Sequence, residues 1–118
     1  GAQNKPSLNI YYSVPVGIYD DNSQLPTDHK LNQNYPNPFN PTTTIEYSLS
    51  SRSHVMISIY NLLGQHVRTL VDEEKRLGSY SVTWDGLNSA GNPVSSGIYL
   101  YRLRAGDYVE SKKMSLLK

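Results

Sequence analysis

The fold is decided by residues 43–60, which read TTIEYSLSSRSHVMISIY. Apolar and polar side chains alternate over 43–49 and again over 55–60, and a period of two is typical of a strand with one buried face. The polar run between the two stretches lacks this period. We therefore predict two half-buried strands here, separated by a turn.

The same alternation continues toward the C-terminus and predicts further strands over 65–71, 80–85, 98–105 and 108–117. Leu70 and Val71 are adjacent apolar residues, which indicates a bulge or an edge position in the strand that contains them. The charged run 72–77 is expected to form no more than a turn. Gly106-Asp107 predicts a two-residue type II′ hairpin, because glycine suits the first central position.

Short strands separated by turns, with no helical period, predict an all-β protein built as an antiparallel β-sandwich of about seven strands. The inner faces of the two sheets are expected to carry ten side chains. These are Ile45, Tyr47, Val55, Ile57, Ile59, Val82, Trp84, Tyr99, Leu103 and Met114.

Composition restricts the classes of function. At about 150 residues per domain, the 118-residue chain holds one core. Lys and Arg number 11 against 10 Asp and Glu, and a net charge of +1 argues against a nucleic-acid binder. The chain has no cysteine, which excludes disulfides, thiolate catalysis and cysteine-ligated zinc. No apolar run approaches the roughly 18 residues of a membrane span, so we expect no integral membrane segment.

Residues 1–30 are expected to lie outside the main domain. Gly1-Ala2 has the character of an expression scar. Residues 7–19 alternate like a strand until a proline and a glycine interrupt them, which predicts an edge or isolated strand through which two copies could dimerise. The polar run 20–30 is interpreted as a linker to a missing upstream cargo domain.

No constellation of residues predicts catalysis. His29, His54 and His66 lack the spacing that places two metal ligands on one face. The acidic runs 20–22 and 72–74 do not alternate around a glycine turn as a calcium loop does. A Gly-x-Ser-x-Gly elbow and a glycine-rich phosphate loop are both missing. The sequence therefore predicts a protein that is not an enzyme and holds no cofactor or metal.

The least ordinary stretch is 31–41, which reads LNQNYPNPFNP. Pro36, Pro38 and Pro41 fix their own φ angles and push the preceding residues toward extended conformations. We expect a stiff, non-helical lead-in to the first regular strand, anchored to the sandwich by Phe39. It is either a structural connection or a preformed recognition element, and physical reasoning alone leaves both open.

Five stretches together resemble a known family. Residues 31–47, 59–67, 82–86, 96–103 and 112–118 are similar, in the same order, to the type A C-terminal sorting domain of the type IX secretion system. The likeness extends over 31–118. Asn61 stands where the family more often has Asp, and His29 where an aromatic residue is common, but both lie away from the signal motifs.

The resemblance implies an immunoglobulin-like domain of a secreted protein in Bacteroidetes-type Gram-negative bacteria. Such a domain is recognised in the periplasm by the type IX translocon and directs its cargo across the outer membrane. A sortase-like surface peptidase then removes it, here within about residues 19–30, and the cargo is anchored at the cell surface or released. The residues implied as the recognition signal are Pro36, Asn37, Pro38, Phe39, Asn40, Pro41, Gly97, Tyr99, Lys113, Met114, Leu116, Leu117 and Lys118.

Two other functions stay open. Tyr60, Tyr101 and Tyr108 could form a flat platform for sugar stacking, as in a carbohydrate-binding module of a secreted polysaccharide-degrading enzyme. A spacer, or an assembly domain like that of the flagellar hook-cap protein, is the second alternative. Residues 102–118 carry five Lys and Arg against two acidic residues, an excess suited to steering toward an acidic receptor surface.

Overall fold

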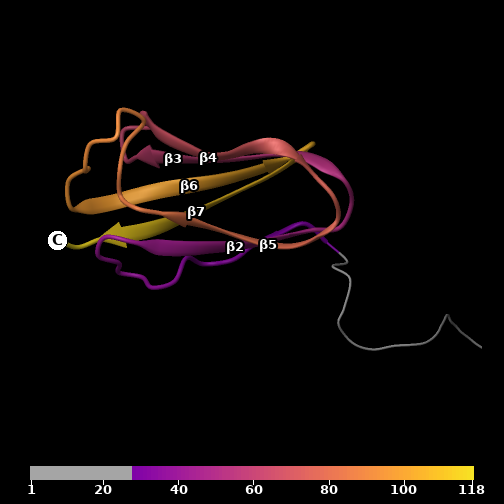
Figure 1. Cartoon of the computed structure of the whole chain (residues 1–118), viewed down its shortest axis with the longest axis horizontal. Helices are drawn as coiled ribbons and strands as arrows, with labels where there is room; N and C mark the ends of the chain where they lie inside the picture. Colours follow the sequence, from indigo (N-terminus) through magenta and orange to yellow (C-terminus); the bar gives the residue numbers. More distant parts are fainter. Residues whose placement is uncertain (1–27) are drawn as a thin grey trace, which may run out of the picture.

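A computed structural model describes residues 28–118 of the chain. The predicted strand over 7–19, the scar at the N-terminus and most of the predicted linker lie outside the described residues. Within 28–118 the chain forms seven strands and no helix (Figure 1). They are β1 (Lys30–Leu31), β2 (Thr43–Leu49), β3 (Ser53–Asn61), β4 (His66–Lys75), β5 (Gly78–Trp84), β6 (Gly97–Ala105) and β7 (Tyr108–Leu116).

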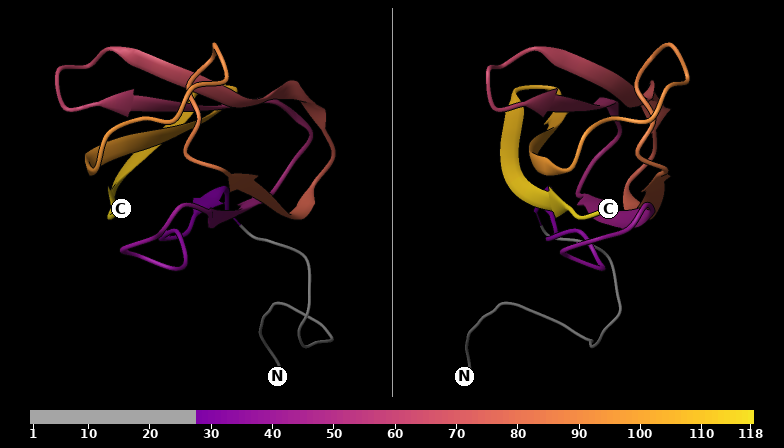
Figure 2. Two further views of the ribbon diagram at one scale, coloured as in Figure 1. Left: turned by 60° about the vertical axis from the view of Figure 1, so that its left-hand side comes forward. Right: turned by 90° about the vertical axis from the view of Figure 1, so that its left-hand side faces the viewer.

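The strands form two antiparallel sheets that pack face to face, which confirms the predicted β-sandwich. One sheet has the strand order β1-β2-β5 and the other the order β4-β3-β6-β7. Figure 2 shows the two layers from the side and from one end. The β6–β7 hairpin turns at Gly106, whose φ of +61° is the positive value predicted for the first central residue of its turn.

The core lies between the sheets and confirms the predicted inner positions. Nine of the ten side chains are buried, and the tenth, Val82, is half-buried and packs against them. Alternation along each strand explains the rest of the pattern, since inward residues of β2 and β6 are buried and their neighbours are not. Further buried apolar residues that were not predicted are Leu31, Leu49, Val71, Tyr101, Ala105 and Leu116.

The prediction that residues 72–77 form only a turn is wrong, because β4 continues to Lys75. Residues 72–75 pair with 53–56 of β3. The acidic residues 72–74 are exposed, and two of them have partners across the strand pair: Arg52 Nε lies 3.2 Å from Glu74 Oε2, and His54 Nε2 lies 2.6 Å from Asp72 Oδ1. The backbone ladder with β3 therefore outweighs the low strand propensity of this run.

The predicted bulge in β4 is confirmed. The register of β4 against β3 shifts twice, so that Leu70 and Val67 each have no residue opposite them. Both side chains are half-buried and pack against the core together with the buried Val71. A bulge bends its strand and re-aims the extra side chain, which here lets three apolar residues of one strand reach the interior.

The two lateral sides of the sandwich differ. On one side, residues 30–39 run along β7 and join the two sheets. On the other side, β4 and β5 are the edge strands. The short turn that connects them crosses between the sheets at one end, and the loop from β5 to β6, in which the N–H of Ser89 donates to the carbonyl of Val67 at 2.9 Å, crosses at the other end (Figure 2). We call these the closed side and the open side.

Candidate functional site

The residues predicted as a recognition signal come from three parts of the sequence, and the structure brings all three to one end of the sandwich. This end carries the loop 36–41, the start of β6 and the end of β7, on the left of Figure 1. The three parts touch through backbone pairing and through a line of aromatic rings. They form one continuous surface, made of the loop 36–41, the start of β6 and the end of β7, which we call the composite surface.

Phe39 joins the proline-rich loop to the last strand. Its N–H donates to the carbonyl of Ser115 at 2.9 Å, and its carbonyl accepts from the N–H of Leu117 at 3.0 Å. The side chain is 1% exposed, which confirms the predicted anchoring role of Phe39. The loop is non-helical, as predicted, but it bends at residues 36–38 and 40–41 instead of running straight.

Two side-chain bonds strengthen this junction. Asn37 Oδ1 accepts from the N–H of Ser115 at 2.9 Å, and Gln33 Nε2 donates to the carbonyl of Lys113 at 2.8 Å. They supply backbone groups at the edge of β7 with partners, so that residues 33–39 cover this edge. An edge covered in this way is closed to pairing with another strand.

Three aromatic rings link the loop to the start of β6. The ring centroid of Phe39 lies 5.7 Å from that of Trp84, which lies 5.5 Å from that of Tyr99. Trp84 is fully buried, and its Nε1 donates to the carbonyl of Leu87 at 2.9 Å. The hydroxyl of Tyr99 donates to the carbonyl of Ser95 at 2.7 Å, and burial raises the pKa of Tyr99.

Gly86 lets the loop approach this cluster closely. Its φ is +78°, and a Cβ at this position would lie 3.1 Å from the carbonyl oxygen of Pro41. A larger residue would therefore strain the backbone and push Pro41 away.

The terminal stretch divides into an inner and an outer set. Met114 and Leu116 are buried, whereas Lys113, Leu117 and Lys118 are exposed. Gly97 is exposed opposite Leu116, and the N–H of Lys118 donates to Ser96 Oγ at 3.1 Å. Only the outer set is available to a receptor. The other exposed residues of the predicted signal are in the loop: Pro36, Asn37, Pro38, Asn40 and Pro41.

Sequence reasoning missed a buried polar network at the base of the loop. The N–H of Asn34 donates to the hydroxyl of Tyr101, which itself donates to the carbonyl of Asn32, each at 2.8 Å. Asn34 Nδ2 donates to Thr43 Oγ1 at 2.9 Å and to the carbonyl of Pro36 at 3.1 Å. Asn34 is 2% exposed, so the network satisfies polar groups that have no access to water.

This network argues against the tyrosine platform for sugars that the sequence left open. Tyr101 is fully buried, and burial raises its pKa to about 12. Tyr60 and Tyr108 are half-buried, and Tyr60 lies under the guanidinium of Arg102, 4.9 Å from its ring centroid. The three tyrosines therefore present no common flat surface to a sugar.

Both departures from the family pattern fit their places. Asn61 Oδ1 accepts from the N–H groups of Leu63 and Gln65 at 2.9 and 3.0 Å, a role that needs only a side-chain oxygen. His29 Nδ1 accepts from the N–H of Ser50 at 3.1 Å, and its ring packs edge-on against Tyr108 with centroids 5.4 Å apart. The imidazole of His29 is itself an aromatic ring and packs as one at this position.

The basic excess near the end of the chain is partly neutralised. Lys112 Nζ lies 3.5 Å from Glu110 Oε2, and the hydroxyl of Tyr108 donates to Glu110. The bond from Tyr108 lowers the pKa of Glu110, while burial raises the pKa of Tyr108 to about 12. Lys113 and Lys118 remain exposed at the composite surface.

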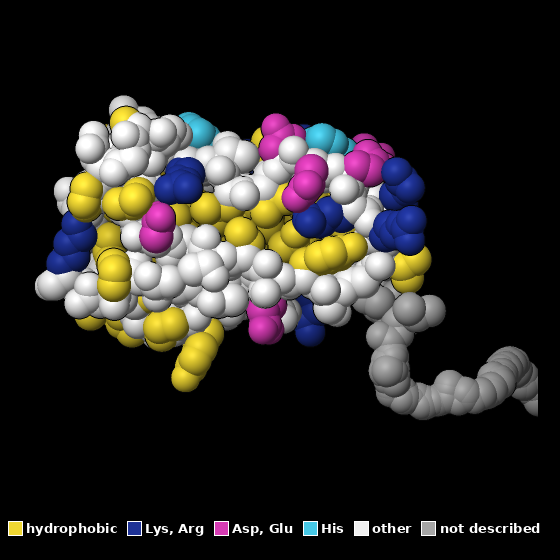
Figure 3. All heavy atoms as spheres, viewed as in Figure 1, with side chains coloured by type: hydrophobic (Ala, Val, Ile, Leu, Met, Phe, Trp, Pro, Cys, Tyr) yellow, Lys and Arg dark blue, Asp and Glu magenta, His cyan; other side chains and the backbone are white. Residues whose placement is uncertain are grey.

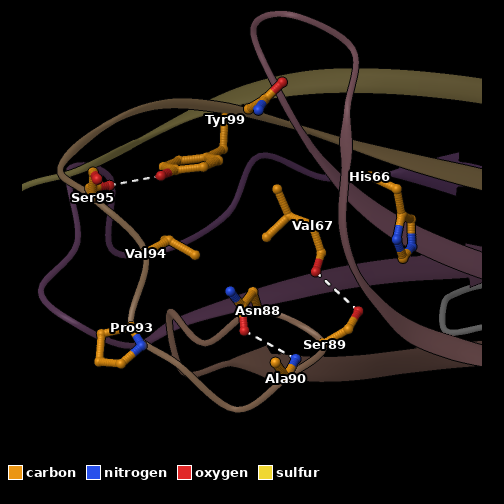
Figure 4. A pocket seen from close by; sticks show the side chains of 10 residues that line it. His66, Val67, Asn88, Ser89, Ala90, Pro93, Val94, Ser95 and Tyr99 are labelled. Atoms are coloured by element: carbon orange, nitrogen blue, oxygen red, sulfur yellow. Dashed lines mark hydrogen bonds between the residues drawn. The ribbon is translucent and has the colours of Figure 1, made fainter.

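An open hollow of about 680 Å³ lies beside the composite surface (Figure 4). Tyr99 and Ser95 are on its rim, next to Val67, Ser89 and Asn88. Its polar groups mostly bond to one another: Ser89 Oγ donates to the carbonyl of Val67 at 3.0 Å, and Asn88 Oδ1 accepts from the N–H of Ala90 at 3.0 Å. Few groups are left to orient a small ligand.

Within residues 28–118, no three His, Asp or Glu side chains gather closely enough to hold a metal ion. Over the same residues, the structure has no helix that is long and apolar enough to span a membrane.

The fold and the arrangement of its loops define an immunoglobulin-like β-sandwich module. The sequence profile of the FlgD Ig-like domain matches residues 38–108, and the chain belongs to this family. None of the curated proteins compared with the chain matches it.

Solved structures share the fold. The dimeric latent PorU of Porphyromonas gingivalis is similar over 85% of this chain and 10% of its own, with 19% identity and a TM-score of 0.60. PorZ of the same organism, an essential surface component of its type IX secretion system, is similar over 81% of this chain and 13% of its own, with 18% identity and a TM-score of 0.53. FlgD of P. aeruginosa is similar over 63% of this chain and 57% of its own, with 24% identity and a TM-score of 0.51. The chain thus spans a small part of PorU and PorZ and little more than half of FlgD.

Proposed function

We propose that residues 31–118 act as a sorting domain that directs a secreted cargo across the outer membrane through the type IX secretion system. The observation that carries this proposal is the composite surface: three sequence motifs that resemble the family's signal meet at one end of the fold. The likeness to PorU and PorZ, the second of which is a component of that system, supports it.

In this proposal the domain is not an enzyme, and the folded surface itself is the signal. The translocon recognises the exposed prolines and asparagines of 36–41 together with Lys113, Leu117 and Lys118. The lysines steer the domain toward an acidic receptor. The domain passes through the periplasm, and its cargo ends at the cell surface or outside the cell.

A sortase-like peptidase then cuts upstream of the domain. We place the cut between residue 19 and Lys30, because Lys30 is already paired with Ser48 in the first sheet. A cut before Lys30 leaves the composite surface intact.

The test is export of a fluorescent cargo. Residues 20–118 are fused behind a Sec signal and a fluorescent protein in a host with the type IX system, and the cells are fractionated. Deleting 113–118 is a poor test, because it also removes the buried Met114 and Leu116. The sharper variant combines Lys113→Ala with Lys118→Ala, since both side chains are exposed.

The matched control combines Arg76→Ala with Arg104→Ala, which removes two exposed cations from the opposite end of the sandwich. We expect the control to be exported and the lysine variant to accumulate in the periplasm. Equal export of both variants would exclude recognition through these lysines. A wild-type fusion retained in the periplasm beside a working domain would reject the sorting function itself.

The match to the FlgD Ig-like family favours a second candidate, an assembly or spacer domain. Such a domain would stabilise its neighbour and would have no effect on export when it is moved to a new cargo. The same fusion experiment therefore separates the two candidates.

A further inference from the structure

The sandwich has four edge strands, and three of them are protected against pairing with another chain. β1 is two residues long. β7 is covered by residues 33–39, which bond to its backbone. β4 carries two bulges and a run of charged side chains. Short length, covering segments, bulges and charges are the known devices that keep sheet edges from aggregating.

The fourth edge strand, β5, has none of these devices. It pairs with β2 over seven residues without a register shift, and it contains neither proline nor a charged residue. Within residues 28–118, no other strand pairs with β5. Ser79, Ser81 and Thr83 are exposed along it.

The register shows which backbone groups of β5 point outward. Thr44 exchanges both of its backbone hydrogen bonds with Tyr35, so the even-numbered residues of β2 face β1 and the odd-numbered ones face β5. The odd residues of β2 lie opposite residues 78, 80, 82 and 84. The N–H and C=O groups of Ser79, Ser81 and Thr83 therefore point away from β2. No hydrogen bond from the described part of the chain reaches them.

An apolar strip lies next to this edge. Val67 and Leu70 of β4 and Tyr80 and Val82 of β5 are half-buried and pack on the core. Figure 3 shows apolar side chains gathered along the middle of this face, between the two edge strands. A monomer rarely leaves such a strip beside a free strand edge, because the two together attract a further strand.

Ion pairs close both ends of the strip. Arg68 Nη1 lies 3.2 Å from Asp85 Oδ1 at one end, and Lys75 Nζ lies 3.2 Å from Glu73 Oε2 at the other. Lys75 also lies 4.8 Å from the ring centroid of Tyr80. Because these charges are already paired, a charged partner would gain little and would pay for desolvation. The strip favours a neutral occupant.

We propose that the outer edge of β5 is a strand-addition site for an extended, neutral segment of a partner protein. The segment has about seven residues, the length of β5, and its side chains alternate between apolar and small polar. Its backbone pairs with Ser79, Ser81 and Thr83. Its apolar side chains cover Val82 and Leu70, while its polar side chains lie beside the hydroxyls of β5. This site is separate from the composite surface and does not depend on the export function.

The test uses the full chain and a synthetic probe, a peptide in which Val and Thr alternate over the length of β5 between flanking Gln residues. Binding is followed by the shifts of backbone amide signals in NMR. We expect the signals of Ser79, Ser81 and Thr83 to shift and their hydrogen exchange to slow. The amides of β7 serve as internal reference, because their edge is covered.

Ser81→Pro removes one outward N–H without touching the ladder to β2, and an edge strand tolerates proline there. It should weaken probe binding by roughly tenfold or more, whereas Ser81→Ala, which keeps the N–H, should leave binding unchanged. A second probe, in which alternate amides are N-methylated, tests the same backbone pairing on the wild-type protein. We expect this probe not to bind, and the result does not depend on whether Ser81→Pro folds.

Unshifted β5 amides at saturating probe would overturn the proposal, as would equal binding of the methylated probe. A dimer that Ser81→Pro abolishes, with no probe binding to the monomer, would also overturn it. That result would assign the edge to a second copy of the chain.

Discussion

The closed and open sides of the sandwich solve the same physical problem in different ways. On the closed side, Phe39, Asn37 and Gln33 bond to β7, and the polar network around Tyr101 lies beneath them. On the open side, half-buried Val and Leu side chains lie between two edges that a single ion pair, Arg68–Asp85, connects. Side chains and loops thus complete one edge of the fold and leave the other to water. We therefore expect the closed side, which carries the composite surface, to be the more rigid of the two sides.

The largest effect is expected at Trp84, which joins the loop of the closed side to β6. Trp84→Ala removes a fully buried ring that contacts both Phe39 and Tyr99. We expect a loss of about 3–5 kcal/mol in the free energy of unfolding. Urea unfolding measures this loss of stability. Val82→Ala is the control, and its expected loss is about 1 kcal/mol or less because Val82 is half-buried. Both residues lie in β5, so equal losses would show that the contacts of Trp84 with Phe39 and Tyr99 add no stability.

High pH should weaken the closed side through ionisation of Tyr101. Burial raises the pKa of Tyr101 to about 12, against a usual value of 10.0. The stabilisation from keeping Tyr101 neutral is therefore present below pH 10 and is lost as the pH rises through 12. Complete ionisation costs about 2–3 kcal/mol.

Urea unfolding of the wild type and of Tyr101→Phe across this pH range checks the prediction. The variant should lose less stability with rising pH, although Tyr47 and Tyr108, whose pKa values burial also raises to about 12, leave it a residual slope. Parallel curves for the two proteins would show that Tyr101 does not ionise in this window.

Asn37→Ala tests the clamp between the loop and β7. It removes the acceptor of the Ser115 N–H, and a loss of about 0.5–1.5 kcal/mol follows because both groups are exposed to water. Hydrogen exchange of the Ser115 amide should become faster, while the amides of β3 stay protected. Asn40→Ala is the matched control, since the Asn40 side chain is also exposed and forms no hydrogen bond within residues 28–118. An unchanged Ser115 amide in Asn37→Ala would show that the backbone bonds of Phe39 alone hold the junction.

The period-two pattern predicted six of the seven strands, β2 to β7, because alternation is a local property that burial imposes on each strand; the two residues of β1 are too few to show it. The pattern missed the last part of β4, because residues 72–74 are charged and exposed, and their pairing with β3 leaves no apolar signal. Tyr101 was an avoidable error, because it has the same parity in β6 as Tyr99 and Leu103, both of which were predicted to be buried.

The candidate site was predictable only in its parts. Phe39 is the single apolar side chain among prolines and asparagines, so its anchoring role follows from composition. Asn34 gives no local signal, since its burial depends on Thr43 and Tyr101, which only the fold brings near. The meeting of the loop with β7 likewise depends on the order of strands in the sheets, and a period of two says nothing about that order.

The smallest effect is expected at the ion pair of the open side. Arg68 Nη1 and Asp85 Oδ1 lie 3.2 Å apart, and their side chains are 35% and 50% exposed, so water and salt screen the pair. A double-mutant cycle with Arg68→Met and Asp85→Asn should give a coupling below about 1 kcal/mol that shrinks with added salt. Asn is the right substitute because it keeps an oxygen for the N–H of Leu87, which donates to Asp85 Oδ1 at 3.1 Å.

A coupling energy well above about 1 kcal/mol that does not change with salt would mean that the ion pair holds β4 firmly to the end of β5. In that case a further strand could enter between β4 and β5 only by disrupting the Arg68–Asp85 ion pair. A weak pair leaves the gap free to open, as strand addition at β5 requires.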